Sequence, residues 1–215
     1  MTKIVKMEIP KIPPNLQSGN FHDMYHDEDP YLSNCMFTNK SVDNEEFERA
    51  VLSKVVFKNV TFNHTSFRKI DITDVVFENC DLSNASFSEG IIHRVKFKEC
   101  KLMGVDFTEA NLVHVSFEKS IAKWSNFADA RLKQVVFRES SLQSANYPDC
   151  KLIKVKFSQC DINDIDFSQT LLNGIDISTC TFERINISLE KLEGCEVSPD
   201  QAIGFARLLG LKIKK

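Results

Sequence analysis

Large apolar residues recur at every fifth position of the chain, without interruption, from Leu32 to Val197. Only Ala122 in this series is small, and only Tyr147 carries a polar atom. A helix with 3.6 residues per turn or a strand with a period of two does not produce a sustained spacing of five. The pattern therefore predicts a chain that turns every five residues around a continuous apolar core.

The position two residues before each large residue is small or β-branched in most repeats. All seven cysteines occupy this position: Cys35, Cys80, Cys100, Cys150, Cys160, Cys180 and Cys195. No CxxC pair is present, so neither a disulfide framework nor a zinc knuckle is indicated. We interpret the cysteines as small buried hydrophobic residues rather than as redox, catalytic or metal-binding groups.

The five-residue repeats show a second periodicity, because residue types at equivalent positions recur every twenty residues. Valines recur at this spacing, each two residues before a phenylalanine: Val55, Val75, Val95, Val115, Val135 and Val155. Phenylalanine alternates with aliphatic residues along the large positions, so it returns every ten residues. This predicts coils of four faces in which two opposite faces carry phenylalanine. Stacked at the strand spacing of about 4.8 Å, eight to nine coils would form a rod about 40 Å long.

Several repeats follow one consensus: a small residue, Asp or Asn, Leu or Phe, a polar residue and a turn residue. The clearest are CDLSN (80–84), ANLVH (110–114), CDIND (160–164) and IDFSQ (165–169). The chain from 32 to 197 thereby resembles the pentapeptide-repeat family. The resemblance implies an all-β fold, a right-handed quadrilateral β-helix with four pentapeptides per coil and the large and small positions pointing inward.

The two ends depart from the repeat and are expected to cap the rod. Residues 1–31 are rich in proline and acidic residues, and are expected to form an N-terminal cap over the first coil or an arm. Residues 198–215 begin with Ser198, Pro199 and Gln201, which supply a helix cap, a first-turn proline and a capping-box partner. We therefore expect three parts: 1–31, the β-helix 32–197, and a short C-terminal helix and tail over 198–215.

Apolar residues of the C-terminal segment cover more of the helix than one buried stripe requires. One apolar surface is expected to pack on the last coil and the other on a second subunit. The expected dimer interface comprises Ile203, Phe205, Leu208, Leu209, Leu211 and Ile213. A cap on a monomer is the alternative.

The C-terminal sequence DQAIGFARLLGLKIKK is similar to the tails of the Qnr proteins and of the mycobacterial fluoroquinolone-resistance pentapeptide protein. With its length and continuous register, the chain looks like the chromosomal Qnr proteins of Gram-positive bacteria. This resemblance implies a cytoplasmic homodimer that binds DNA gyrase, and in many members topoisomerase IV, as a mimic of DNA. Such a protein inhibits supercoiling and lowers quinolone susceptibility. The absence of loops between coils departs from the plasmid-borne Qnr proteins, and a β-helical scaffold or adaptor for an unrelated protein is the alternative function.

Acidic residues gather on one face of the expected rod: Glu89, Asp106, Glu109, Asp129, Asp149 and Asp166. Four of them, all except Asp106 and Asp166, share one corner position and are expected to form a column. Neighbouring carboxylates about 5 Å apart in water repel by roughly 1 kcal/mol per pair before salt screening. The column is the expected gyrase-binding surface, standing in for DNA phosphates; ordinary solvated turn residues are the alternative. The next face is basic, with Arg94, Arg131, Lys133, Lys151 and Lys154.

Other functions find no support in the sequence. A net charge of −3 argues against a simple polycationic nucleic-acid binder. No apolar stretch has the length of a membrane span or a signal peptide, so we expect no membrane contact and a cytoplasmic location. A convex rod without HExxH, GxSxG, Walker or Rossmann motifs is expected to be no enzyme and to need no cofactor, metal or small-molecule substrate. His93 and His114 are expected to be neighbours on the basic face without a third metal ligand.

Overall fold

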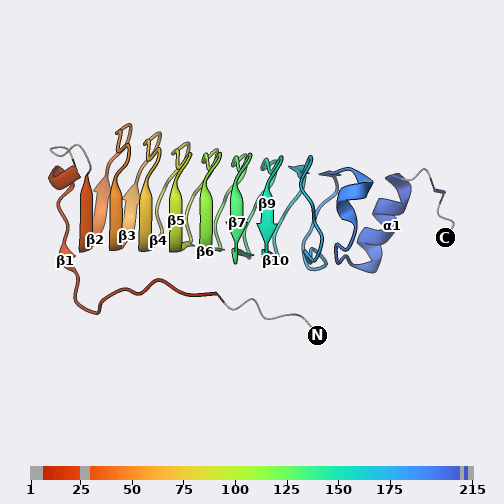
Figure 1. Cartoon of the computed structure of the whole chain (residues 1–215), viewed down its shortest axis with the longest axis horizontal. Helices are drawn as coiled ribbons and strands as arrows, with labels where there is room; N and C mark the ends of the chain where they lie inside the picture. The colour runs from red at the N-terminus through yellow and green to blue at the C-terminus, as the bar shows by residue number, and fades with distance from the viewer. Residues whose placement is uncertain (1–6, 25–29, 209–210, 213–215) are drawn as a thin grey trace.

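The computed structural model describes residues 7–24, 30–208 and 211–212. The chain winds into a long rod of stacked coils, with a helix at its C-terminal end (Figure 1). The main strands are β2 (Tyr31–Ser41), β3 (Val51–Thr61), β4 (Asp71–Glu78), β5 (Ile91–Lys98) and β6 (Asn111–Glu118). Shorter strands are β1 (Gln17–Ser18), β7 (Arg131–Lys133), β8 (Val136–Arg138), β9 (Lys151–Ile153), β10 (Lys156–Ser158), β11 (Ile165–Asp166) and β12 (Ile185–Asn186). The helical elements are the 3₁₀ helices η1 (Phe21–Met24) and η2 (Leu189–Leu192) and the α-helix α1 (Pro199–Leu208).

The strands from β2 onward pair in parallel, and each residue lies beside the residue twenty positions later. Val55 pairs with Val75, Val75 with Val95, and Val95 with Val115. One coil therefore takes twenty residues, and the rod has about eight turns. This confirms the predicted all-β solenoid with a short C-terminal helix.

The core contains two ladders of stacked aromatic rings, and aliphatic residues fill the two faces between them. In one ladder the ring centroids of Phe77 and Phe97 are 4.9 Å apart, as are those of Phe97 and Phe117. The other ladder contains Phe87, whose ring meets Phe97 edge-on at 6.1 Å and 80°. Because edge-to-face contacts suit the charge distribution of aromatic rings, the two ladders interlock across the coil. The predicted opposite phenylalanine faces are confirmed.

The corners are formed by one residue in each pentapeptide with positive φ. These residues lie two positions after each large residue and continue without a gap from Asn34 (φ 51°) to Gly174 (φ 73°). This left-handed conformation bends the chain by a quarter turn, and most side chains tolerate it only at a cost of about 1–2 kcal/mol per residue. The energy of the buried core offsets that cost in every coil.

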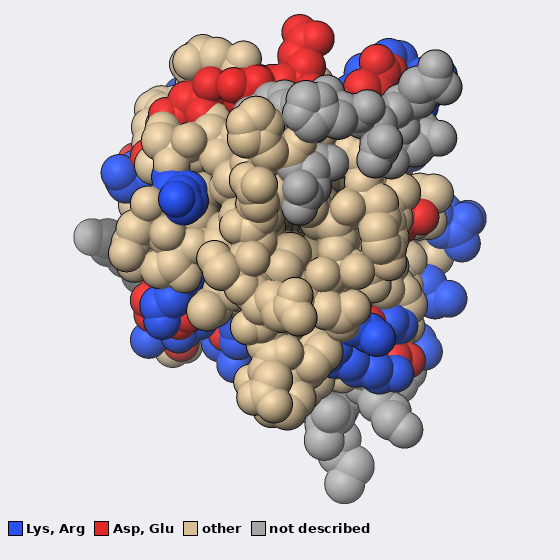
Figure 2. Space-filling model, turned by 90° about the vertical axis from the view of Figure 1, so that its left-hand side faces the viewer, with Lys and Arg blue, Asp and Glu red and all other residues tan. Residues whose placement is uncertain are grey.

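The N-terminal segment caps the first coil. Strand β1 pairs with β2, and the Phe21 ring of η1 lies 4.1 Å from that of Phe37. Met24 is buried against the same end of the core. Seen from this end, the surface is mostly uncharged in the middle, and most charged side chains lie toward the periphery (Figure 2). Residues 7–16 do not cover the end but run back along the side of the rod (Figure 1).

The C-terminal helix α1 begins as the sequence predicts. The Ser198 N–H donates to Gln201 Oε1 at 2.9 Å, and the Gln201 N–H donates to Ser198 Oγ at 3.3 Å. Gln201 Nε2 also donates to the carbonyls of Ile177 and Cys180, which ties the helix to the last coil. In the part of the chain that the structure describes, no helix is long and apolar enough to cross a membrane.

All seven cysteines are thiols rather than disulfides, six of them buried and Cys195 partly buried. Burial raises the pKa of the Cys150 thiol to about 12. This agrees with the interpretation of these residues as small parts of the core.

Candidate protein-interaction surface

Three of the expected acidic residues form an exposed column on one corner of the rod. Glu109, Asp129 and Asp149 occupy corner positions on consecutive coils with φ of 59°, 58° and 53°. The main-chain N–H of Glu109 donates to the carbonyl of Ala128, beside Asp129, which places the two corners on adjacent coils. Within the described residues these three carboxylates have no hydrogen bond or ion pair, and all three residues are exposed. We call them the acidic strip.

Glu89 lies in the same column but is neutralised by the coil before it. Its carboxylate is 2.6 Å from Arg68 Nη2 and 3.8 Å from Lys69 Nζ. The hydrogen bond and the charge of Glu89 raise the pKa of Arg68. The column is therefore acidic only from Glu109 onward, because Arg49 and Lys69 occupy its first corners.

Asp106 and Asp166 lie on the neighbouring flat face rather than on the corner, and both close local turns. The Asp106 carboxylate accepts the main-chain N–H of Thr108 at 3.0 Å, and that of Asp166 accepts the N–H of Ser168 at 2.8 Å. The hydroxyl groups of Thr108 and Ser168 donate to the same carboxylates. Aspartate commonly stabilises turns in this way, so these two residues have a structural role that the sequence analysis missed.

A group of bases borders the acidic strip on the next two faces, and we call it the basic patch. It contains Arg131, Lys133, Arg138, Lys151, Lys154 and Lys156. No ion pair involves these six side chains within the described residues. Elsewhere on the rod, opposite charges often pair between adjacent coils, as Lys98 does with Glu78 at 2.6 Å. The middle of the rod therefore presents unpaired charges of both signs side by side.

Arg94 was expected on this basic face but is paired with a buried acid. Asp74 is only 4% exposed, and its two carboxylate oxygens accept Arg94 Nε at 2.6 Å and Nη2 at 2.9 Å. These hydrogen bonds hold the pKa of Asp74 below its usual value, assisted by the main-chain N–H of Lys11. The pair lies on consecutive corners, so opposite charges twenty residues apart were the signal that would have found it.

The same corner holds the two histidines and the N-terminal segment. The ring centroids of His93 and His114 are 5.7 Å apart, as expected from their spacing. The main-chain N–H of Glu8 donates to His114 Nδ1 at 3.1 Å, and the Glu8 carboxylate is 3.8 Å from both Arg94 and His114. Burial lowers the pKa of His93, and the nearby Arg94 and His114 lower it further. Among the described residues, no group of three or more His, Cys, Asp or Glu side chains could hold a metal ion.

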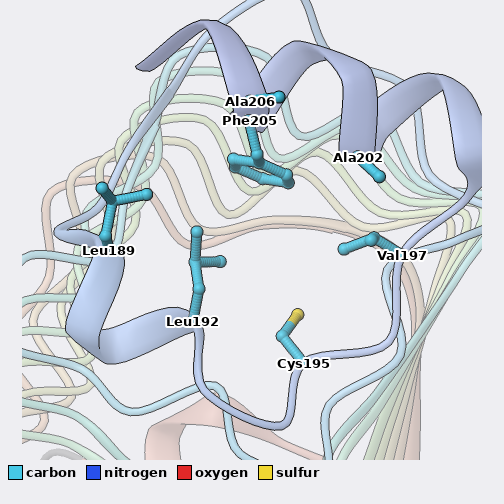
Figure 3. A pocket seen from close by; sticks show the side chains of 7 residues that line it. All are labelled: Leu189, Leu192, Cys195, Val197, Ala202, Phe205 and Ala206. Carbon is cyan, nitrogen blue, oxygen red and sulfur yellow. The ribbon is translucent and has the colours of Figure 1, made fainter. Parts of the chain in front are cut away.

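An apolar pocket of about 280 Å³ lies between η2 and α1 (Figure 3). It is lined by Leu189, Leu192, Cys195, Val197, Ala202, Phe205 and Ala206. Phe205 points into this pocket and contacts the Phe182 ring at 5.8 Å. It therefore helps to cover the last coil.

Of the other residues expected at the dimer interface, two are exposed and the side chains of three are not described by the structure. Ile203 and Leu211 are 44% and 58% exposed, as a contact with a second subunit would require. Leu209 and Ile213 lie outside the described residues, and the side chain of Leu208 is not described either. The dimer interface stays a prediction.

Comparison with known proteins supports the fold. The pentapeptide repeat region profile matches residues 70–147, and the SV2A/B/C luminal domain profile matches residues 25–107. No curated protein sequence matches significantly.

Two solved structures resemble the chain over most of its length. One is HetL, a pentapeptide repeat protein involved in heterocyst differentiation regulation in the cyanobacterium Nostoc sp. strain PCC 7120. It has a TM-score of 0.63 and 18% identity, and the match covers 78% of this chain and 83% of HetL. The other is trypsin-treated QnrB1, a plasmid-mediated fluoroquinolone resistance protein. Its TM-score is 0.54 and its identity 19%, and the match covers 84% of this chain and all of that one. At these identities the likeness concerns the fold alone.

Proposed function

Because the chain is a pentapeptide-repeat protein with the β-helical fold of QnrB1, we propose that it binds DNA gyrase as a mimic of DNA. Topoisomerase IV is a second target of the same mechanism. Binding in the cytoplasm inhibits supercoiling and lowers quinolone susceptibility. The observation that carries the proposal is the acidic strip, Glu109, Asp129 and Asp149, exposed and unpaired on consecutive coils.

The strip suits a cationic groove because the main chain that carries its three charges is fixed before binding. Each residue sits on a corner fixed by the main-chain ladder, so the carboxylates are spaced at about the coil repeat of 4.8 Å. Adjacent carboxylates repel by about 1 kcal/mol in water, and no base in the described chain lies within ion-pair distance. A groove built to hold phosphates would offset that repulsion, which is why the strip favours a DNA-binding partner.

The basic patch gives the proposed complex a direction. Arg131 and Lys151 follow Asp129 and Asp149 by two residues in the same coils. The basic patch therefore lies directly beside the acidic strip, along its length. A partner that accepts both must place an acidic wall beside its cationic groove. This charge pattern would select one orientation of the rod on the enzyme.

The proposed active form is a homodimer joined through its C-terminal segments. Exposed Ile203 and Leu211 and the pocket beneath α1 support such a contact. A symmetric dimer would double the length of the rod, and the acidic strips of both copies could then engage one two-fold symmetric enzyme.

The test is a gyrase supercoiling assay with and without ciprofloxacin, using the native protein and two triple variants. One reverses the strip (Glu109→Lys, Asp129→Lys, Asp149→Lys). The control reverses three exposed acids elsewhere (Glu46→Lys, Glu99→Lys, Glu183→Lys) and has the same net charge. We expect the strip variant to inhibit at least about ten-fold more weakly than the native protein, with the control close to native. Equal potency of the two variants would contradict the mimic.

A scaffold or adaptor for an unrelated protein is the second candidate function. The observation that favours it is the likeness to HetL, a protein of this fold involved in regulating differentiation. No effect of the folded native protein on gyrase at micromolar concentration would favour this function over the first.

A further inference from the structure

Residues 7–16, which we call the strap, lie along one corner of the rod in extended conformation. The strap crosses the corner at Asp74, Arg94 and His114, which belong to three consecutive coils. Two main-chain groups anchor it: the N–H of Glu8 on His114 and the N–H of Lys11 on Asp74. Figure 1 shows this segment running beside the coils, separate from the capping elements β1 and η1.

The strap is held weakly compared with the rest of the chain. Its ion pairs with the rod are long: the Glu8 carboxylate is 3.8 Å from both Arg94 and His114, whereas Arg94 and Asp74 meet at 2.6 Å. It pairs with no strand, and Ile9 is 71% exposed. Segments with few buried contacts open at much lower free energy than a core.

The coils beneath the strap do not need it to form. Their own main chains are bonded, as in the 2.8 Å contacts from Ile91 N to the Ile70 carbonyl and from Asn111 N to the Gly90 carbonyl. The core residues Ile72 and Ile92 are fully buried within the coils. Opening the strap would therefore uncover a prepared polar site and leave the rod intact.

We propose that Asp74, Arg94 and His114 form a docking site for an extended peptide segment of a partner protein that carries one carboxylate three residues before a main-chain N–H donor, and that the strap occupies this site until the segment displaces it. The strap shows the chemistry that fits. A carboxylate faces Arg94 and His114, and a main-chain N–H three residues later reaches Asp74. Pro10, Pro13 and Pro14 favour the extended form, so little conformational entropy is lost on docking.

The test uses the full-length chain with the strap released by Glu8→Ala and Lys11→Pro, which removes the carboxylate and the N–H donor to Asp74. The probe is a fluorescein-labelled peptide of residues 5–16, and fluorescence anisotropy reports its binding. The tethered strap competes at an effective concentration in the millimolar range. We therefore expect the released variant to bind the peptide at least about ten-fold more tightly than the native chain.

Three controls define the site. A chain with Ile9→Ala and Lys11→Ala keeps Glu8 and both N–H donors, and is expected to behave like the native chain. Asp74→Asn with Arg94→Gln in the released background removes both charges together and is expected to abolish binding. Should that pair disturb folding by circular dichroism, His114→Gly, which tolerates the positive φ of this corner and removes the acceptor of the Glu8 N–H, is expected to weaken binding about ten-fold.

Equal binding to native and released chains, binding that survives the site substitutions, or no binding to the released chain at millimolar peptide would overturn the proposal. The strap would then be only a part of the fold. These outcomes do not involve gyrase, so they are independent of the function proposed above.

Discussion

The coils between Val51 and Glu118 and the coils after Gly174 share one five-residue spacing but differ in regularity. In the first region the strands run for eight to eleven residues, and every corner has positive φ. Its large residues, such as Phe77 and Phe97, are fully buried. In the second region strands shrink to two residues, and Phe182, Ile187 and Leu192 are only partly buried.

The residues between the large positions explain this difference. Of the four corner positions between Gly174 and Val197, Thr179, Arg184 and Leu189 lack positive φ, and only Gly194 has it (φ 75°). A β-branched residue such as Thr179 resists the left-handed conformation. Glu190 takes an inward small position, where a carboxylate cannot be buried without a partner, and it lies exposed. Large residues thus keep the coils in register, whereas corner and small residues decide how tightly each coil closes.

The proposed contact with gyrase and the proposed contact with a second subunit fall in regions of different regularity. The acidic strip lies on regular coils whose corners are fixed, as recognition by charge requires. The looser end leaves the apolar pocket beside α1, which suits a contact made by packing.

The largest expected difference between the two regions comes from truncating a ring. Phe97→Ala should lower the free energy of unfolding by about 3–5 kcal/mol, because it leaves a cavity in a closed ladder. Phe182→Ala should lower it by less than half as much, because this ring is already partly exposed. Urea unfolding followed by circular dichroism measures both, and equal losses would show that the end is packed as tightly as the middle.

Substitution of Tyr147 shows how much a hydroxyl group in the aromatic ladder costs in stability. Its hydroxyl is buried and has no hydrogen-bond partner among the described residues. A buried unsatisfied polar group costs about 1–3 kcal/mol, so Tyr147→Phe should raise the free energy of unfolding by about that amount. Phe127→Tyr, in the neighbouring coil of the same ladder, is the reverse change and should lower it. An unchanged stability of Tyr147→Phe would mean that water reaches the hydroxyl.

Glycine substitutions at one corner of each region compare how much the corner conformation affects stability. Lys154 has a φ of 54°, so Lys154→Gly should stabilise the chain by about 0.5–1 kcal/mol, since glycine adopts this conformation freely. Thr179→Gly should give no such gain, because the corner there does not use positive φ. Thermal unfolding of both variants measures the difference, and a gain at both positions would contradict the explanation given for the loose end.

The smallest expected effect is a pH dependence of the free energy of unfolding. It arises from His93, which lies in the central coils. Its pKa is lowered in the folded chain, chiefly by burial, so folding favours the neutral ring. The resulting stability is present above the unfolded-state pKa of about 6.5 and is lost as pH falls below it. Urea unfolding between about pH 7.5 and about pH 5.5 should show this loss, and His93→Gln should reduce it. If the stability of His93→Gln depends on pH as strongly as that of the native chain, another group is responsible for the effect.

The rod follows from the amino-acid sequence alone. A spacing of five and a period of twenty specify which residues point inward and which residues stack, because each coil repeats the geometry of the one before. The phenylalanine ladders, the buried cysteines and the capping box of α1 all follow from that local pattern. The column of corner acids follows as well, since its members differ by twenty residues.

Contacts between coils and within turns, which the repeat pattern does not reveal, set which of these acids are free. Glu89 meets Arg68 and Lys69 of the preceding coil, Asp106 and Asp166 turn back to their own main chain, and the acidic strip keeps three members. The strap was equally beyond the sequence, because residues 7–16 have no repeat to place them. A periodic segment inherits its position from its neighbours, whereas an aperiodic one is placed only by contacts with residues distant in the chain, here Asp74 and His114.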